Sequence, residues 1–351
     1  MMTKLITSLS LWLETVWSRM KVRGAERRLR ERSLELAVER VVSQSNPALR
    51  GLPSYRRRLK PVVARLLEHV ESLEAHLPGP TDVDPASWSA DPLVNVLFGN
   101  VECIRRAVSG PAVRDWLKAN PIETSDHLYG LLVAWPRERT QLGMELVGDH
   151  VQRDVKQRTL SFTDHELFGV GADLNETRRS LARQITDLLV SIGIGRIAEQ
   201  EERMVDIETA LRKLRIKLKV INPRVGGADL VLAGSSHHLA ERERLEREIK
   251  TLEKDLADAS RGLGDIEQYL NRLVEVLDHP EQELMLERMT LWVDRMNIVR
   301  DRADPDARQI TLVRARRRDQ PGRIAQLICF PRGLVISPEE RLAAVERHLA
   351  K

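Results

Sequence analysis

A run of ten apolar positions between Leu245 and Leu277 constrains the fold more than any other feature of the chain. The positions follow one another at alternating steps of four and three residues: Leu245, Ile249, Leu252, Leu256, Ala259, Leu263, Ile266, Leu270, Leu273 and Leu277. Most of the residues between them are Glu, Arg, Lys or Asp. An apolar seam of this period with charged flanks is typical of a coiled-coil helix. The sequence therefore predicts a long helix that packs along one stripe.

A second seam precedes the first, and a segment rich in helix breakers separates the two. The second seam covers Ile197 to Ile221, and a continuation with one register break reaches back to Leu181. The separating segment, NPRVGGADLVLAGSS, contains one proline and three glycines. We expect an antiparallel coiled-coil helical hairpin over 175–279 with its tip at 222–236.

The hairpin makes specific contacts predictable. Leu211 should lie near Leu245 and Ile249, and Ile185 should lie near Leu273. Two seams of this kind can also pair between two chains. The short loop favours pairing within one chain, because closing a short loop costs little conformational entropy.

The rest of the chain is interpreted as mostly helical, so the predicted fold class is mainly α. We expect an irregular helical domain over 1–150, a connecting β/turn segment over 151–174, the hairpin, and a region over 280–351 with a helix, a β-ribbon and a terminal helix. Expected helices in the first domain are 54–77, 91–108, 111–119, 125–134 and 136–148. In the last region we expect a helix from 280 to 300, strands at 309–316 and 323–330, and a final helix from a Ser337–Glu340 capping box.

Charge is distributed unevenly along the chain. The formal net charge is +4, yet residues 1–65 hold 15 Lys/Arg against 5 Asp/Glu. An amphipathic helix near the start carries Trp12 and Trp17, and a basic run with Arg27, Arg28 and Arg30 follows it. This combination suits an anionic membrane surface, but we favour a helix packed on its own domain with solvated arginines. The apolar stretch is too short to span a bilayer.

Two Asp-His dipeptides are the first candidates for chemistry. If residues 148–168 fold as a hairpin with a turn near Gln157, His150 lies opposite Asp164 and Asp149 lies opposite His165. Carboxylate and imidazole suit Zn²⁺, Mn²⁺ or acid–base catalysis. The nearby cations Arg153, Lys156 and Arg158 would oppose a metal ion. We therefore favour a charged surface turn, without a metal or another cofactor.

The segment Gly193–Ala198 matches the pattern G-x-G-x-x-A of dinucleotide-binding loops. No further βαβ unit is predicted after it, so we favour a glycine-softened joint in a helix. The sequence contains no Walker A, H-E-x-x-H, G-x-S-x-G or C-x-x-C pattern. Cys103 and Cys329 sit in apolar runs and fit a reducing cytoplasm.

These observations favour a non-enzymatic protein-interaction or scaffold protein that is cytoplasmic, with attachment to the inner membrane surface as an open alternative. Its protein partner would contact the apolar tip residues Leu230, Val231 and Leu232. Nucleic acid is an alternative partner through the basic N-terminus and the ribbon residues Arg316, Arg317 and Arg318. A nucleotide- or metal-dependent enzyme is the other alternative.

Overall fold

The computed structural model describes residues 30–147, 150–221, 235–260, 266–318, 320–337 and 339–340. The chain divides into two compact units, and neither is continuous in sequence. Unit 1 comprises Met1–Arg65 and Val190–His279, and unit 2 comprises Leu66–Leu189 and Pro280–Lys351.

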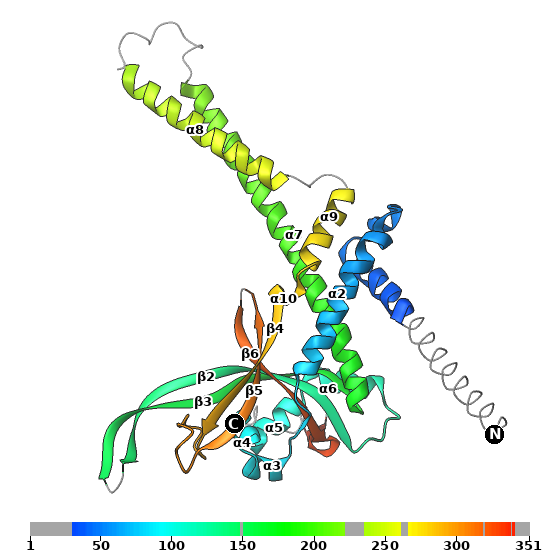
Figure 1. The fold of residues 1–351 in the computed structure, drawn as a ribbon, viewed down its shortest axis with the longest axis vertical. Helices are drawn as coiled ribbons and strands as arrows, with labels where there is room; N and C mark the ends of the chain where they lie inside the picture. The colour runs from blue at the N-terminus through cyan, green and yellow to red at the C-terminus, as the bar shows by residue number, and fades with distance from the viewer. Residues whose placement is uncertain are drawn as a thin grey trace, which may run out of the picture. The chain divides into compact units, whose positions relative to one another are not determined.

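Unit 2 is built on a six-stranded sheet in the order β3-β2-β6-β5-β4, with β1 joined to β6 (Figure 1). Neighbouring strands are antiparallel except β1, which runs parallel to β6. The strands are β1 (Thr81–Asp82), β2 (His127–Val147), β3 (His150–Gly171), β4 (Leu284–Val293), β5 (Arg308–Arg317) and β6 (Gln320–Pro331).

The predicted mainly α fold class is wrong, because this sheet organises unit 2. The segments 125–134 and 136–148, expected as helices, belong mostly to the single strand β2, and β4 occupies part of the helix expected up to residue 300. In β2, Leu128 and Leu132 are buried on one face, while Leu131 packs on the other. A central strand that is apolar on both faces lacks the alternation that separates strands from helices.

Helices cover both faces of the sheet. On one face, α3 (Pro85–Ala90), α4 (Pro92–Leu97), α5 (Val101–Val108) and α6 (Pro111–Ala119) share a core with β2, β3, β5 and β6. On the other face, Leu77 and Leu181 pack against Val313 and Leu327. Leu77 follows α2 (Tyr55–His76), and Leu181 lies near the start of α7 (Leu174–Ile221). Unit 2 thus has three layers, and β3 is an edge strand of the middle one.

Several local predictions are confirmed. The helix at 111–119 has the bounds of α6, and strands occupy 309–316 and 323–330. Glu340 N donates to Ser337 Oγ at 3.1 Å, and Ser337 N donates to Glu340 Oε2 at 3.2 Å. This is the predicted capping box, which satisfies two backbone donors reciprocally. The structure also contains α10 (Pro280–Glu283) and the 3₁₀ turns η1 (Pro47–Gly51) and η2 (Arg332–Leu334).

Unit 1 contains a helix over 30–45, the first part of α2, α7 from Val190, α8 (Ser235–Ser260) and α9 (Ile266–Leu277). Heptad positions of α7 and α8 meet in one cluster formed by Leu211, Leu214, Leu245 and Ile249. Arg215 Nη2 also contacts Glu253 Oε1 at 2.7 Å. The two helices run side by side over this stretch (Figure 1).

A single long coiled-coil hairpin over 175–279 is nevertheless not what the chain forms. The seam from Leu245 to Leu277 is divided between α8 and α9, with residues 261–265 outside the described range. The start of α7 serves another core, because Leu181 and Ile185 pack in the cluster under the sheet of unit 2. Heptad spacing specifies which side of a helix is apolar and leaves open what covers that side.

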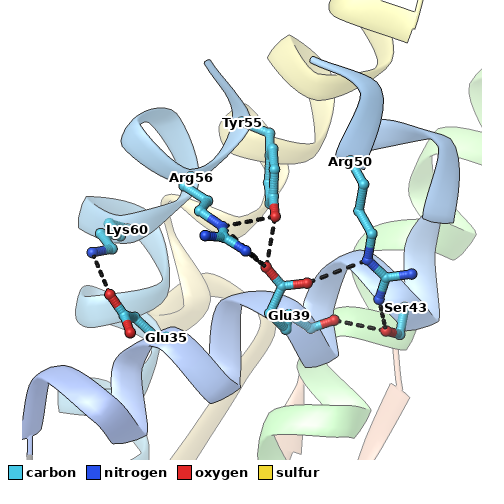
Figure 2. A network of polar contacts seen from close by, with 7 residues as sticks. All are labelled: Glu35, Glu39, Ser43, Arg50, Tyr55, Arg56 and Lys60. Carbon is cyan, nitrogen blue, oxygen red and sulfur yellow. Dashed lines mark hydrogen bonds and ion pairs between the residues drawn. The ribbon is translucent and has the colours of Figure 1, made fainter. Parts of the chain in front are cut away.

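A polar network attaches the helix at 30–45 to the elements that follow it (Figure 2). Glu39 accepts hydrogen bonds from Tyr55 Oη at 2.6 Å, Arg56 Nη2 at 2.9 Å and Arg50 Nε at 3.2 Å. The Tyr55 hydrogen bond, followed by those of the two arginines, lowers the pKa of Glu39. Arg50 and Arg56 belong to the basic region 1–65, so part of its excess positive charge is paired with Glu39 within unit 1. Over the described residues, no helix is both long and apolar enough to cross a membrane.

Candidate functional site

The strand β3 lies at one edge of the six-stranded sheet, and its outer edge is only partly covered by other described residues. At residues 158–160 this edge is partly covered, because Val299 N donates to Arg158 O at 2.7 Å and Leu160 N donates to Asn297 O at 2.9 Å. From Ser161 to Gly171, no backbone hydrogen bond reaches the outer edge from any part of the chain that the structure describes. Alternate residues of an edge strand direct their N–H and C=O groups outward, and these can pair with another strand.

A groove of about 560 Å³ follows this edge. Its floor is formed by β3 from His165 to Val170, and its walls come from α6 and the first turns of α7. The wall residues are Gly110, Pro111, Ala112 and Trp116 on α6 and before it, and Ser180 and Gln184 on α7. Because the two helices cover opposite faces of the sheet, the groove lies between them along the open edge. Its volume is in the range of protein ligand sites, roughly 300–1,000 Å³.

Two irregularities in β3 shape the floor. The register with β2 shifts between Val133 and Trp135 and again between Tyr129 and Leu131. On β3 these shifts coincide with positive backbone angles, φ +53° at Asp164 and φ +61° at Gly169. Such bulges bend an edge strand and change the direction in which its side chains point. Between them, Glu166, Leu167 and Phe168 remain regularly paired with β2.

The side chains of this short regular stretch differ in exposure. Leu167 is buried in the core, whereas Phe168 is 39% exposed. Glu166 is exposed and lies 3.5 Å from Arg323 Nη1. Phe168 therefore offers an apolar surface within the groove.

A hydrogen-bonded junction joins the two walls at one end of the groove. Trp116 Nε1 donates to Glu176 Oε1 at 3.2 Å, and Ala172 N donates to Glu176 Oε2 at 2.8 Å. Glu176 N in turn donates to Asp173 Oδ1 at 2.8 Å, which caps the start of α7. Both carboxylate oxygens of Glu176 are thus engaged, so this residue holds the walls in place.

His165 anchors the first bulge from within the fold. Its Nε2 lies 2.7 Å from the carbonyl oxygen of Leu97, and because a carbonyl only accepts, Nε2 carries the proton. The ring stacks on Phe98 with centroids 5.0 Å apart. Burial lowers the pKa of His165, although the Leu97 hydrogen bond and the Asp164 charge act in the opposite direction. The imidazole is therefore neutral near pH 7, and its role is structural.

The two Asp-His pairs do not converge across a hairpin, and the charged surface turn that the sequence favoured is instead part of a strand. Residues 150–171 form one continuous strand, whose partner is β2, so no turn occurs near Gln157. His150 and Asp164 are fourteen residues apart on β3, roughly 45 Å at the rise of an extended strand. Asp149 and the side chain of His150 lie outside the described residues. Where the structure describes the chain, no group of three His, Cys, Asp or Glu residues could hold a metal ion.

The dinucleotide alternative for Gly193–Ala198 is contradicted, because this segment and the apolar run directly before it both lie inside α7. A Cβ placed on Gly193 would lie 3.1 Å from Leu277 Cδ2 of α9. The lack of a side chain at Gly193 therefore allows α7 and α9 to pack closely at this point. A Cβ on Gly195 would meet no atom within 4 Å.

The basic ribbon at 316–318 is largely engaged with neighbours. Arg316 Nη1 lies 3.3 Å from Glu287 Oε1, and Arg318 Nη1 lies 3.7 Å from Glu283 Oε1. Arg317 Nη1 donates to Gln320 Oε1 at 3.3 Å. These contacts weaken the case for a phosphate-binding ribbon.

Most other predicted interaction residues lie outside the described ranges, namely Trp12, Trp17, Arg27, Arg28, Leu230, Val231 and Leu232. Arg30 is the first described residue of the helix at 30–45, and it is exposed. The prediction for these residues is therefore untested.

Sequence reasoning missed Trp116, Phe168, Gly169 and the two walls of the groove. One signal was present in the run HELFGVG, where glycines interrupt an apolar segment. A glycine inside a strand often marks a bulge or a close backbone approach. Comparison of the chain with protein-family models, with curated proteins and with solved structures finds no match.

Proposed function

We propose that the chain is a non-enzymatic protein-interaction protein that binds an extended segment of a partner protein along the edge of β3. The observation that carries this proposal is the unpaired edge from Ser161 to Gly171 at the floor of a groove. An added strand would supply the missing backbone hydrogen bonds, which give affinity in this mode of recognition.

Side chains of the bound segment would alternate between the two walls. On one side they meet Ala112 and Trp116 of α6, and on the other they meet Phe168, Ser180 and Gln184. Apolar and small polar surfaces of this kind favour a segment with apolar residues at alternate positions. The bulges at Asp164 and Gly169 limit the regular pairing to a short stretch, which restricts uncontrolled pairing with other chains.

A binding role fits the groove better than catalysis. His165 is neutral and donates its Nε2 proton to the Leu97 carbonyl, and both oxygens of Glu176 accept hydrogen bonds. These groups are committed to holding the walls and the floor. Cys103 and Cys329 are free thiols, which supports the proposed cytoplasmic location.

A display library of random peptides, selected on the full-length chain, tests the proposal. Selected peptides should bind the wild type and lose at least tenfold in affinity when alternate backbone nitrogens are methylated, since methylation removes the donors of an added strand. Ser180→Arg, which places a large side chain in the groove, should weaken the same peptides similarly.

Ser72→Arg is the matched control, because Ser72 is an exposed helix residue of unit 2 that lies neither on the β3 edge nor in the groove lining. Its binding should equal that of the wild type. Peptides that bind Ser180→Arg as tightly as the wild type, or that tolerate backbone methylation, would show that the β3 edge is not the binding site.

A further inference from the structure

The last turns of α7 carry a second surface, on the side of the helix that faces away from α8. Leu211, Leu214 and Leu218 point toward α8 in the shared cluster. At 100° per residue, Ile216 and Val220 fall on the opposite side. They are 56% and 80% exposed, respectively, which is unusual for large β-branched side chains on a helix.

Cations flank this exposed pair on both sides. From Thr209 to Ile221 the helix contains five basic residues and no acidic one. Arg215 pairs with Glu253 of α8. The other four are Arg212, Lys213, Lys217 and Lys219, all exposed, and within the described residues no ion pair involves them.

The neighbouring helix does not neutralise this excess. Between residues 241 and 255, α8 carries six acidic and five basic residues. One of these acids, Glu253, pairs with Arg215, and Glu246 pairs with Arg242 of its own helix at 2.9 Å. The cationic character of the outer face of α7 therefore remains.

We infer that this face, defined by Arg212, Lys213, Ile216, Lys217, Lys219 and Val220, binds an anionic lipid surface. A narrow apolar stripe with cations on each side suits a helix lying on a bilayer, where the stripe enters the acyl boundary and the cations meet the headgroups. The two apolar side chains are too few to hold the protein on a neutral membrane, so binding requires anionic lipid. Like-charge repulsion disfavours a second copy of the same face as the occupant.

Nucleic acid fits this surface less well. The stretch has no aromatic residue on which a base could stack, and the centre of its outer face is occupied by Ile216 and Val220. Both apolar side chains would remain against phosphates without a partner.

Vesicle co-sedimentation of the full-length chain tests the inference. The protein should bind phosphatidylcholine vesicles that contain about a third phosphatidylserine, bind pure phosphatidylcholine poorly, and dissociate as salt rises to about 0.5 M. The double variant Lys213→Gln with Lys217→Gln should bind the anionic vesicles about thirtyfold more weakly. Each cation near the surface contributes about 1 kcal/mol, and about 1.4 kcal/mol corresponds to a tenfold change in binding. The control variant Lys250→Gln with Lys254→Gln removes the same charge from α8, and it should change binding to the anionic vesicles less than twofold.

The apolar stripe has its own matched pair of variants. Ile216→Ser with Val220→Ser should weaken partition severalfold. Val205→Ser should not, although Val205 is 61% exposed, because it lies about 16 Å further down the helix from Ile216. The inference would be overturned if the protein bound both vesicle types equally. It would also be overturned if the Lys213/Lys217 and Ile216/Val220 variants bound anionic vesicles as well as the wild type does. The inference would also be overturned if the Lys213/Lys217 variant lost binding to a nucleic-acid oligomer while it kept its binding to vesicles.

Discussion

Gly169 determines how closely α7 can approach β3. Its φ of +61° lies in the left-handed region, and an added Cβ would lie 2.5 Å from Leu181 Cγ. Leu181 is a core residue beneath the sheet of unit 2. A side chain at position 169 would therefore conflict with both the backbone conformation and the packing of the groove wall.

Gly169→Ala should lower the free energy of unfolding by about 2–4 kcal/mol, from overpacking and a strained backbone together. Gly195→Ala is the control, because it lies inside α7 with no atom within 4 Å of the added Cβ. That change should raise stability by up to about 1 kcal/mol, since alanine is the better helix former. Urea denaturation measures both variants, and equal effects would contradict the role assigned to Gly169.

His165 should make the stability of unit 2 depend on pH. Burial lowers its pKa below the ordinary value of 6.5, so below about pH 6.5 the unfolded chain binds more protons than the folded chain. The free energy of unfolding therefore falls as pH falls through this region.

His165→Gln, which keeps an N–H donor for the Leu97 carbonyl, should reduce this loss. Thermal unfolding at about pH 7.5 and about pH 5.5 gives the comparison. The wild type should lose more stability on acidification than the variant does. An identical loss in both would show that His165 is not the titrating group.

At the scale of elements, α7 is apolar on more than one side, and each side has a different use. Its first turns cover the sheet of unit 2, its later turns contact α8, and Ile216 and Val220 face outward. A helix of 48 residues can serve separate partners along its length. The heptad pattern alone does not distinguish these uses, because it records only the spacing of apolar residues.

Two substitutions on α7 separate the packed side from the outward side. Leu211 is 3% exposed, so Leu211→Ala should cost about 2–4 kcal/mol from lost burial and a residual cavity. Ile216 is 56% exposed, and Ile216→Ala should change stability by less than about 0.5 kcal/mol. Circular dichroism during denaturation, in the absence of lipid, measures both. Similar losses would mean that Ile216 is packed.

At the scale of the whole molecule, both units are assembled from segments distant in sequence. The sheet of unit 2 takes β2 and β3 from before residue 189 and β4 to β6 from after residue 280. β2 pairs with β6 from His127 to Ala134, and Phe330 and Leu128 share one core. A cut of the chain at 189 therefore leaves half a sheet.

Residues 66–189 produced alone should fail to fold, because β2 loses β6 and the core loses one side. Co-expression with residues 280–351 should restore a folded, co-purifying pair with β-sheet signal in circular dichroism. Residues 190–279 supply no strand among the described residues and serve as the control for co-expression. A folded 66–189 fragment, or rescue by 190–279, would contradict this division.

Local signals in the sequence were sufficient for some elements. Proline after an aspartate or glycine marked the starts of α4 and α6, and Ser337 with Glu340 marked a helix start. The strands β5 and β6 showed strand-forming residues with clear turn signals between them. Such features depend on contacts within a few residues, so they can be read without knowing the fold.

The sequence by itself determined the starts of α4 and α6 and the spacing of the apolar residues along α7 and α8. Only the tertiary structure decided that β2 is a strand, that the start of α7 covers a sheet, and that α6 and α7 flank an open edge. A central strand buried on both faces and a buried helix have similar sequences, and long-range pairing of β2 with β6 selects between them. The groove exists because two segments separated by nearly fifty residues, Gly110–Trp116 and His165–Val170, meet at one sheet edge. No local pattern encodes that meeting.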